Sequence, residues 1–369
     1  MIIQIKPFDT LFFRDGKPFS MGDEVWASGI FPPPPSVIYG ALRTAYFATH
    51  PQTLSKAQQA DDPTRNLKVS FIGLAIGSQL FIPVGQDLVR EKEEKSNQHF
   101  LSLESSHVWG SSPFMQGNVT HKSILRPGTI KPVEAYEKGS MISFRDLGRY
   151  LYPTKASGKK LLETQEMGNY LTKDSKTGIG RSRKTGSAEE GQLYRVEMLR
   201  MATASQSDIS LVVQFEGLDL PSEGLLKLGG EAKACTYRST DRFSFQLLTK
   251  NSFTGPFRLY LATPAIFKAG WKPNPISPNA PLEVMLNGIP VRLLGAAIDK
   301  PLFQGGFDIK KRAFKPMKRM VGAGSVFFCE LLNPNQDADQ AIIRLHGQCI
   351  SDEKAREGYG LAYLGSVPS

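Results

Sequence analysis

The sequence predicts an α+β fold that opens as a ferredoxin-like βαββαβ unit. Residues 2–6 alternate between two faces, as a strand does. Apolar residues within 37–46 recur at the spacing of an amphipathic helix. Two apolar runs follow, at 69–76 and 79–84, and a Gly-Ser turn joins them into an adjacent strand pair. Strand, helix and two strands in this order are the first half of that unit.

The first helix is expected to begin at Val37, directly after a rigid run of prolines (Pro32–Pro35), with Ser36 as its N-cap. A charged run at 90–95 then leads into sequence without periodicity up to about residue 120. Residues 139–191 resemble a long loop or insertion, because they are polar, glycine-rich and basic.

Strands and one helix are predicted for the rest of the chain. The strand candidates are Ile209–Phe215, Phe243–Leu248, Phe257–Ala262, Pro290–Leu294 and Ser325–Leu331. A helix is expected within 337–350, where His346 lies among apolar residues and is interpreted as a packed core histidine. Gly358 and Gly360 then open a last strand.

The length of 369 residues suggests about two domains. We expect the first over residues 1–205, including the basic insertion, and the second over residues 206–369.

Charge and composition narrow the class of protein. Lys and Arg number 45 against 35 acidic residues, a net charge of +10 that favours a polyanionic partner such as RNA, although a solvated basic surface would give the same balance. The longest apolar stretch, residues 71–85, is shorter than the roughly 18–20 residues of a membrane span. The amino-terminal residues lack the features of a signal peptide. These observations predict a soluble cytoplasmic protein with no membrane contact.

Signatures of catalysis, metal binding and cofactor binding are absent from the sequence. It has no phosphate loop, no dinucleotide fingerprint and no HExxH or GxSxG motif. Its three cysteines lie far apart, and its five histidines are scattered without ligand spacing. The sequence therefore predicts no enzyme activity, no metal site and no cofactor.

Two basic clusters are the best candidates for RNA contact. Residues 310–319 combine basic side chains with Phe314, which suits a segment laid along a phosphodiester backbone. The second cluster runs from Lys173 to Lys184 and overlaps the glycine-punctuated stretch 177–186. The candidate RNA-binding residues are Arg14, Lys17, Arg43, Arg181, Arg183, Lys184, Lys310, Lys311, Arg312, Lys315, Lys318, Arg319, Gly358 and Gly360. Solvated loops are the alternative for the basic clusters, and a hairpin-shaping role is the alternative for the two glycines.

Several motifs, in this order and over nearly the whole length, closely resemble the family of third subunits of the type III-B CRISPR Cmr complex, which belongs to the RAMP superfamily. The motifs are FDTLFFRDGKPF (8–19), FPPPPSVIYGALR (31–43), EEGQLYRVEMLR (189–200), LGGE (228–231), ATPAIFKAGW (262–271), FDIKKRAFKPMKRMVGAGSVFF (307–328) and GYGLAYLG (358–365).

The resemblance implies two ferredoxin-like (RRM-like) domains with long loop insertions. It also implies a non-catalytic subunit that binds the repeat-derived 5′ handle of the crRNA in antiviral defence. The implied protein partners are the large polymerase-like subunit and an adjacent RAMP backbone subunit. Residues 31–35 and 271–281 are candidate partner surfaces, with rigid loop packing as the alternative.

Two other functions stay open at this point. A RAMP endoribonuclease that processes CRISPR precursor RNA would need a proton-transfer residue near the first helix, and Tyr39, Tyr46 and His50 are the candidates. The equivalent handle-binding subunit of a related type III system is the other alternative.

Overall fold

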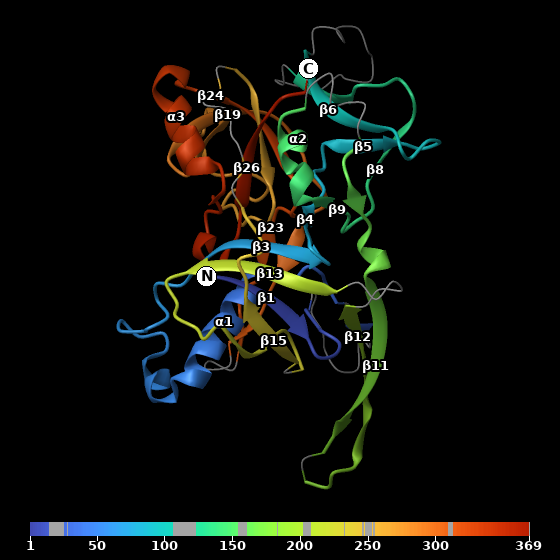
Figure 1. Ribbon diagram of the computed structural model, residues 1–369, viewed down its shortest axis with the longest axis vertical. Coiled ribbons are helices and arrows are strands. Elements are labelled where there is room, and N and C mark those ends of the chain that lie inside the picture. The colour runs from blue at the N-terminus through green and yellow to red at the C-terminus, as the bar shows by residue number, and fades with distance from the viewer. Residues whose placement is uncertain are drawn as a thin grey trace.

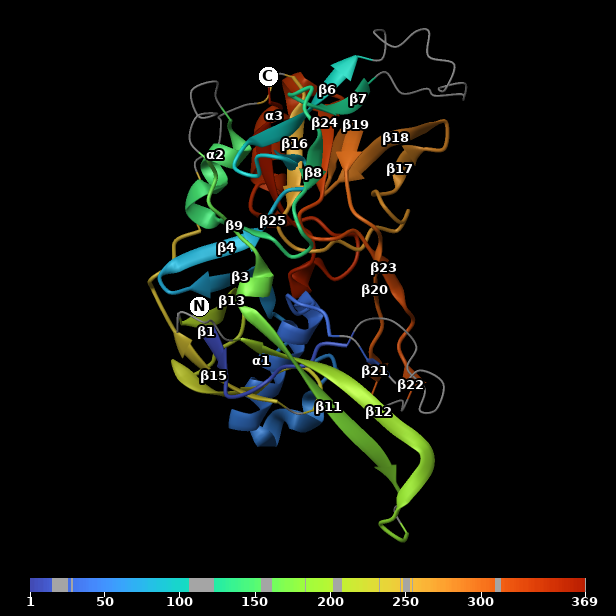
Figure 2. The ribbon, with the colours of Figure 1, turned by 90° about the vertical axis from the view of Figure 1, so that its right-hand side faces the viewer.

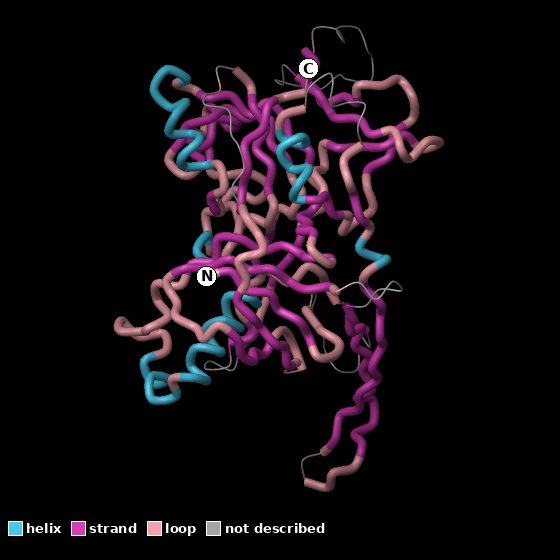
Figure 3. Tube along the Cα trace, viewed as in Figure 1, coloured by secondary structure: helices cyan, strands magenta, loops and turns pink. Residues whose placement is uncertain are grey.

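The computed structural model describes residues 1–14, 26–27, 29–105, 123–153, 161–182, 184–201, 208–231, 233–245, 247, 253, 255–308 and 313–368. Strands are the most abundant regular elements in this part of the chain and helices are few (Figure 3), which confirms the mixed α and β class. The α-helices are α1 (Pro35–Thr49), α2 (Leu147–Leu151) and α3 (Pro334–Leu345). Short 3-10 turns are η1 (Pro51–Lys56), η4 (Phe144–Asp146), η6 (Met167–Asn169) and η7 (Ala355–Glu357). Among the described residues, no helix has both the length and the apolar character that crossing a membrane requires.

The first large sheet takes its strands from residues 2–239, the first two thirds of the chain. Its strands, in spatial order, are β10 (Thr164–Gln165), β9 (Met141–Ser143), β4 (Gln79–Pro83), β3 (Lys68–Ile76), β13 (Ile209–Glu216), β1 (Ile2–Pro7), β15 (Ala234–Ser239) and β14 (Glu223–Lys227). The predicted strands at residues 2–6, 69–76 and 79–84 are confirmed. However, β3 and β1 are separated by β13, which comes much later in the chain.

The second large sheet contains only carboxy-terminal strands (Figure 1). In spatial order they are β17 (Pro275–Ser277), β18 (Ala280–Leu286), β19 (Ile289–Ala297), β24 (Val326–Leu331), β16 (Phe257–Leu261), β26 (Leu361–Ser366) and β25 (Gln348–Cys349). A small separate sheet holds β7 (Ser123–Pro127), β6 (Gln98–Ser105), β5 (Leu88–Glu91) and β8 (Val133–Ala135). Strand β6 of this small sheet lies in a part of the sequence that has no clear hydrophobic periodicity.

The strands of the two large sheets are divided at a point later in the chain than the predicted domain boundary at residues 205 and 206. The strands β13, β14 and β15 follow that predicted boundary and still pair within the first sheet. The division between sheets falls between β15, which ends at Ser239, and β16, which begins at Phe257. Residues 243–245 and 247 are not in a strand, so the strand predicted at Phe243–Leu248 is wrong for these described residues.

Apolar side chains arrange the molecule as successive layers of α1, first sheet, second sheet and α3. Ile38 and Leu42 of α1 pack with Ile3 and Ile5 in one core cluster. A second cluster joins the opposite face of the first sheet to Tyr260 and other residues of the second sheet. Ala341 and Leu345 of α3 complete a third cluster on the far face of the second sheet.

The first helix begins earlier than predicted. It starts at Pro35 with Pro34 at the N-cap position, and proline is favoured in the first turn because its φ is already helical and no N–H is needed there. Ser36 therefore lies inside the first turn and is not the N-cap.

Part of the predicted loop at 139–191 is a long antiparallel hairpin instead. Strands β11 (Leu171–Arg181) and β12 (Ala188–Met201) pair over almost their full length, and β12 also pairs with the two-residue β2 (Trp26–Ala27). The hairpin projects away from the two sheets (Figure 1). Hydrophobic periodicity missed β11 because most of its side chains are exposed on both faces.

His346 lies at the end of α3 and packs as predicted. Its Nδ1 accepts a hydrogen bond from the Leu364 N–H at 3.2 Å, and its ring meets the Tyr363 ring edge-on with centroids 5.3 Å apart. Burial lowers the pKa of His346 to about 4, so the side chain is neutral at pH 7.

Candidate RNA interface

Between β19 and β24 the chain leaves the second sheet as a narrow arm, residues 302–320. At its root β20 (Leu302–Gln304) pairs with β23 (Lys318–Met320), and farther out β21 (Phe307–Asp308) pairs with β22 (Ala313–Phe314). The arm runs down from the second sheet toward the level of α1 (Figure 2), where Gln304 contacts Ser36 of that helix.

The described part of the predicted basic cluster lies on this arm. Lys315 and Arg319 are exposed, and Lys318 is half-buried with its Nζ 3.0 Å from a Glu353 carboxylate oxygen. Lys310, Lys311 and Arg312 lie outside the described residues. The exposed ammonium and guanidinium groups suit the arm to an anionic strand.

A groove of about 790 Å³ separates the arm from the first sheet and the hairpin. The proline run (Pro32–Pro35), the arm and the base of the hairpin all contribute to its walls. Phe303 and Met317 offer apolar surface on the arm side, with exposed fractions of 47% and 49%. Lysines line the groove at positions 138, 173 and 300, and carboxylates line it at positions 137, 197 and 299. Lys173 Nζ lies 3.1 Å from a Glu197 carboxylate oxygen. Apolar surface and cations together suit RNA, whose bases stack while its phosphates attract cations.

A polar contact fastens the arm to the first helix. Gln304 on the arm donates to the Ser36 hydroxyl, and the Tyr359 hydroxyl donates to Gln304 Oε1. Burial raises the pKa of Tyr359 to about 12, which keeps its hydroxyl protonated as a donor. Three motifs that are far apart in sequence therefore meet here: the proline run, the basic arm and the glycine-rich turn. Sequence reasoning missed Ser36, Gln304 and Tyr359 as a group because pairing across such separations leaves no local pattern.

The glycines on either side of Tyr359 are buried, and the backbone N–H of each already donates a hydrogen bond within the chain. The Gly358 N–H donates to the Ala355 carbonyl at 3.0 Å, and the Gly360 N–H donates to the Pro264 carbonyl at 2.8 Å. Both residues have positive φ, 101° and 74°. The structure thus supports the alternative in which these glycines shape the chain, because neither N–H is available to a phosphate.

Gly360→Ala is expected to destabilise the protein. The left-handed backbone alone costs an L-residue about 1–2 kcal/mol, and the added Cβ would lie 2.6 Å from the Ser351 nitrogen. Gly40→Ala in α1 is the matched control, since its Cβ meets nothing within 4 Å and alanine favours helix by up to about 1 kcal/mol. Urea-induced unfolding measures both changes. Equal stability of Gly360→Ala and the native protein would contradict this account of the turn.

Arg43 on α1 has partners within the chain. Its Nη2 lies 2.5 Å from Asp62 Oδ2, and its Nε donates to the Thr64 hydroxyl at 2.6 Å. Burial works against ionisation of Asp62, but hydrogen bonds from Thr64 and Gln58 and the charge of Arg43 hold its pKa below the ordinary value. This pairing fixes the segment after α1 to the helix and orients the guanidinium.

Of the other basic candidates, Arg14 pairs with the groove-lining Gly29, and the rest lie at the hairpin tip or outside the described residues. Arg14 is exposed and forms a β-bridge with Gly29, while Lys17 is not described. Arg181 and Lys184 are exposed at the hairpin tip, where Arg181 Nε donates to the Gly186 carbonyl at 2.8 Å. Arg183 is not described. The structure therefore brings the arm, and not the hairpin tip, to the groove.

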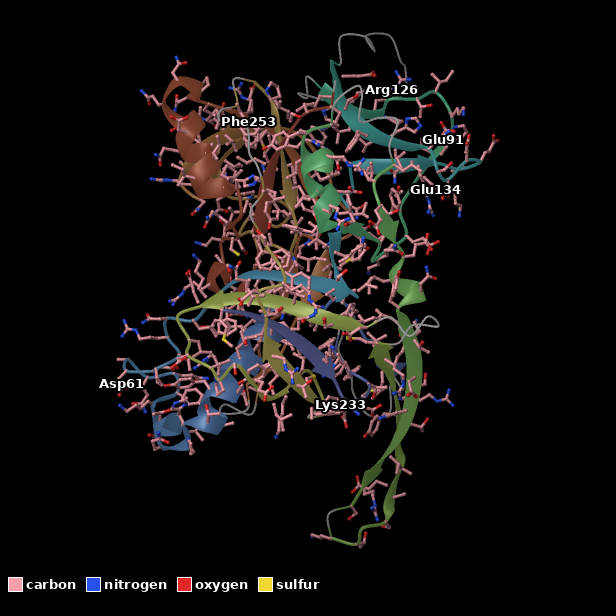
Figure 4. The ribbon with its side chains drawn as sticks, in the orientation of Figure 1. Asp61, Glu91, Arg126, Glu134, Lys233 and Phe253 are labelled. Carbon is pink, nitrogen blue, oxygen red and sulfur yellow. The ribbon has the colours of Figure 1, made fainter. Side chains whose placement is uncertain are left out.

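Ion pairs fasten the root of the hairpin to the first sheet. Asp9, just after β1, accepts from Arg200 of β12 at 3.0 Å and lies 3.5 Å from Lys233 Nζ. Figure 4 labels Lys233, which directly precedes β15. The backbone N–H and carbonyl of Leu11 bond to those of Leu199 in β12 at 2.7 and 2.8 Å. These contacts set the direction in which the hairpin projects.

Comparisons with known proteins identify the family. The model of the family described as CRISPR-associated protein (Cas_Cmr3) matches residues 3–367. A chain of the type III-B Cmr-beta complex bound to cognate target RNA and AMPPnP is 13% identical, with a TM-score of 0.51 over 89% of this chain and 86% of that chain. A chain of the complex bound to cognate target RNA is 15% identical, with a TM-score of 0.48 and the same coverage. A chain of the type III-A Csm3–Csm4 subcomplex is 10% identical, with a TM-score of 0.37 over 90% of this chain and 93% of that chain.

No curated protein matches the chain. The solved structure with a TM-score of 0.51, at 13% identity, agrees in fold alone. The family match, in contrast, spans nearly every residue and confirms the family that the sequence motifs resemble. The chain belongs to the CRISPR-associated Cas_Cmr3 family.

Proposed function

We propose that the protein is a non-catalytic RNA-binding subunit of a type III-B CRISPR (Cmr) effector complex. In this role it anchors the 5′ handle of the crRNA, pairs with the large polymerase-like subunit and lies beside a RAMP backbone subunit. Membership of the Cas_Cmr3 family supports the complex, and related Cmr-beta complexes are described as bound to target RNA. The family also favours this assignment over a subunit of another type III system.

The observation that carries the RNA-binding part of the proposal is the arm beside the groove. Lys315, Lys318 and Arg319 lie on one short segment, next to the exposed apolar surface of Phe303 and Met317. A single strand is held by cations along its backbone and by flat or apolar surfaces against its bases. The rigid contact of Gln304 with Ser36 keeps this segment at a fixed distance from the first helix.

We also propose that both sheets derive from ferredoxin-like units. Four strands of the first sheet lie in the spatial order β3, β13, β1, β15, and four of the second lie in the order β19, β24, β16, β26. When the four strands of each set are numbered along the chain, their spatial order is second, third, first, fourth. This is the strand order of a βαββαβ unit. The first unit keeps a helix, α1, in its first crossover, and the second keeps α3 in its second crossover.

An endoribonuclease would use Tyr39, Tyr46 or His50 of the first helix. The Tyr46 and His50 rings stack with centroids 4.4 Å apart, and His50 Nδ1 lies 3.1 Å from the Tyr46 carbonyl oxygen. One ring nitrogen of His50 is therefore occupied by the end of its own helix. This arrangement accounts for both side chains as a helix-end contact and supports the non-catalytic reading.

Binding and cleavage of one RNA test the proposal together. The purified full chain is mixed with labelled RNA that begins with the repeat-derived handle, and with a scrambled control, in EDTA. We expect preferential binding of the handle RNA with no shortening of it. Specific cleavage that Tyr46→Phe or His50→Ala abolishes would contradict the non-catalytic role, and equal affinity for both RNAs would contradict handle recognition.

A further inference from the structure

A second hollow of about 500 Å³ lies at the root of the arm and shares Asp299, Pro301 and Met320 with the groove. One wall is the stretch 293–296 of β19, where the strand register shifts between Leu293 and Gly295. Such a bulge bends a strand and re-aims its side chains, and bulges are common next to binding sites. The size and the mostly apolar lining are those of a site for a small organic group.

Trp271 supplies an aromatic surface to this hollow. Its ring is nearly parallel to that of Phe327, with 16° between the planes and centroids 6.5 Å apart, which fixes its orientation against the second sheet. The residue is nevertheless 40% exposed, although tryptophan normally buries most of its large surface. An oriented, partly exposed indole is a stacking surface for a flat partner.

Two cations accompany the ring. Arg319 of the arm lines the hollow, and Lys272 Nζ lies 5.6 Å from the centroid of the Trp271 ring. One carboxylate, Asp299, is also present, and its Oδ1 accepts the Lys300 N–H at 2.7 Å. The flat Trp271 ring, the Arg319 cation and the Asp299 acceptor that line the hollow match a nucleotide, which combines a planar base bearing N–H donors with a phosphate.

We propose that this hollow is a nucleotide subsite, in which one base of the bound RNA stacks on Trp271 while its phosphate meets Arg319. The proposal rests on the RNA-binding function above and adds a specific subsite to it. An RNA strand is favoured over a free nucleotide as the ligand, because Lys315 and Lys318 continue the basic surface from Arg319 along the arm. A purely apolar partner would offer no anion to the Arg319 guanidinium that lines the hollow.

The test uses the full chain, RNA that begins with the repeat-derived handle, and free AMP. The handle RNA is expected to quench the tryptophan fluorescence of the native protein. Trp271→Phe should remove the quenched component, since Trp26 and Trp109 are unchanged in that variant. Trp271→Ala is expected to weaken RNA binding about tenfold, as loss of one base-stacking contact does. Arg319→Gln, on the exposed arm, should weaken binding as well and guards against misfolding of the tryptophan variants.

Two exposed residues of the first sheet serve as controls. Leu225→Ala on β14 and Arg238→Gln on β15 remove similar surface and charge, and should leave RNA affinity unchanged. Quenching by RNA but not by equimolar AMP supports the RNA strand as the source of the base. Quenching by AMP but not by RNA would overturn the assignment of the bound base to an RNA strand, and would indicate that the hollow binds a free nucleotide.

The remaining outcomes separate this inference from the proposed function. RNA binding by the native chain with normal affinity in Trp271→Ala and Arg319→Gln would overturn the subsite alone. Normal RNA affinity in a Trp271→Ala protein that no longer retains the large subunit would also overturn it, in favour of a protein contact. Absence of RNA binding in every protein would overturn the proposed function itself.

Discussion

We expect the replacement of Lys315, Lys318 and Arg319 together by alanine to cause a large loss of RNA affinity. Each phosphate contact to a single strand contributes about 0.7 to the salt slope, so loss of three contacts lowers the slope by about 2 and weakens binding about a hundredfold near 0.1 M salt. Filter binding of handle RNA at several salt concentrations measures both quantities.

A control triple removes the same charge elsewhere. Lys56, Lys95 and Arg238 are at least half-exposed and belong to surface ion pairs outside the arm. Their replacement by alanine changes the net charge equally and should leave the salt slope almost unchanged. If both triples lowered the slope to the same extent, RNA binding would follow the total charge of the protein, and the arm would have no special role.

Asp87→Ala is expected to produce the largest loss of stability. Asp87 and Arg258 form an ion pair with side-chain exposures of 0% and 1%, and the Tyr150 hydroxyl donates to the other carboxylate oxygen at 2.5 Å. Burial and the adjacent carboxylate raise the pKa of Tyr150, which therefore stays a donor. Arg258 also donates to the carbonyls of Leu151 and Ser366, at 3.1 and 2.8 Å. Removing one partner of a buried pair costs about 3–5 kcal/mol, because the other charge stays desolvated.

The same measurement on an exposed pair provides the comparison. Glu223 and Arg238 pair at 3.1 Å with side-chain exposures of 66% and 79%, and such pairs contribute about 0–1 kcal/mol. Urea-induced unfolding of Glu223→Ala should therefore nearly match that of the native protein. Asp87→Ala within about 1 kcal/mol of the native protein would show that the buried pair does not hold the loop after β4 against the second sheet.

The strands that the sequence predicted correctly are those with one buried face or a continuous apolar run. Ile3 and Ile5 of β1 are fully buried while their neighbours are less so, and this produces the alternation on which the prediction rests. The hairpin strand β11 has no such contrast, so hydrophobic periodicity could not separate it from a loop. Its partner β12 supplies the hydrogen bonds that form it.

Pairing between distant segments is the part that the sequence could not predict. β13 resembles a strand in the sequence, but nothing local indicates that it lies between β1 and β3. In the same way, the basic cluster at 310–319 was visible as charge, whereas its position beside the proline run depends on Gln304, Ser36 and Tyr359. Charge therefore pointed to the arm, and tertiary contacts decide which groove it borders.

Recovery of the tagged protein from its host tests the central claim most directly. The RNA that co-purifies is sequenced, and the proteins are identified by mass spectrometry. We expect crRNAs that share one 5′ handle, together with a large polymerase-like subunit. The protein alone, or with RNA of mixed sequence, would contradict its role as the handle-anchoring subunit of a Cmr effector.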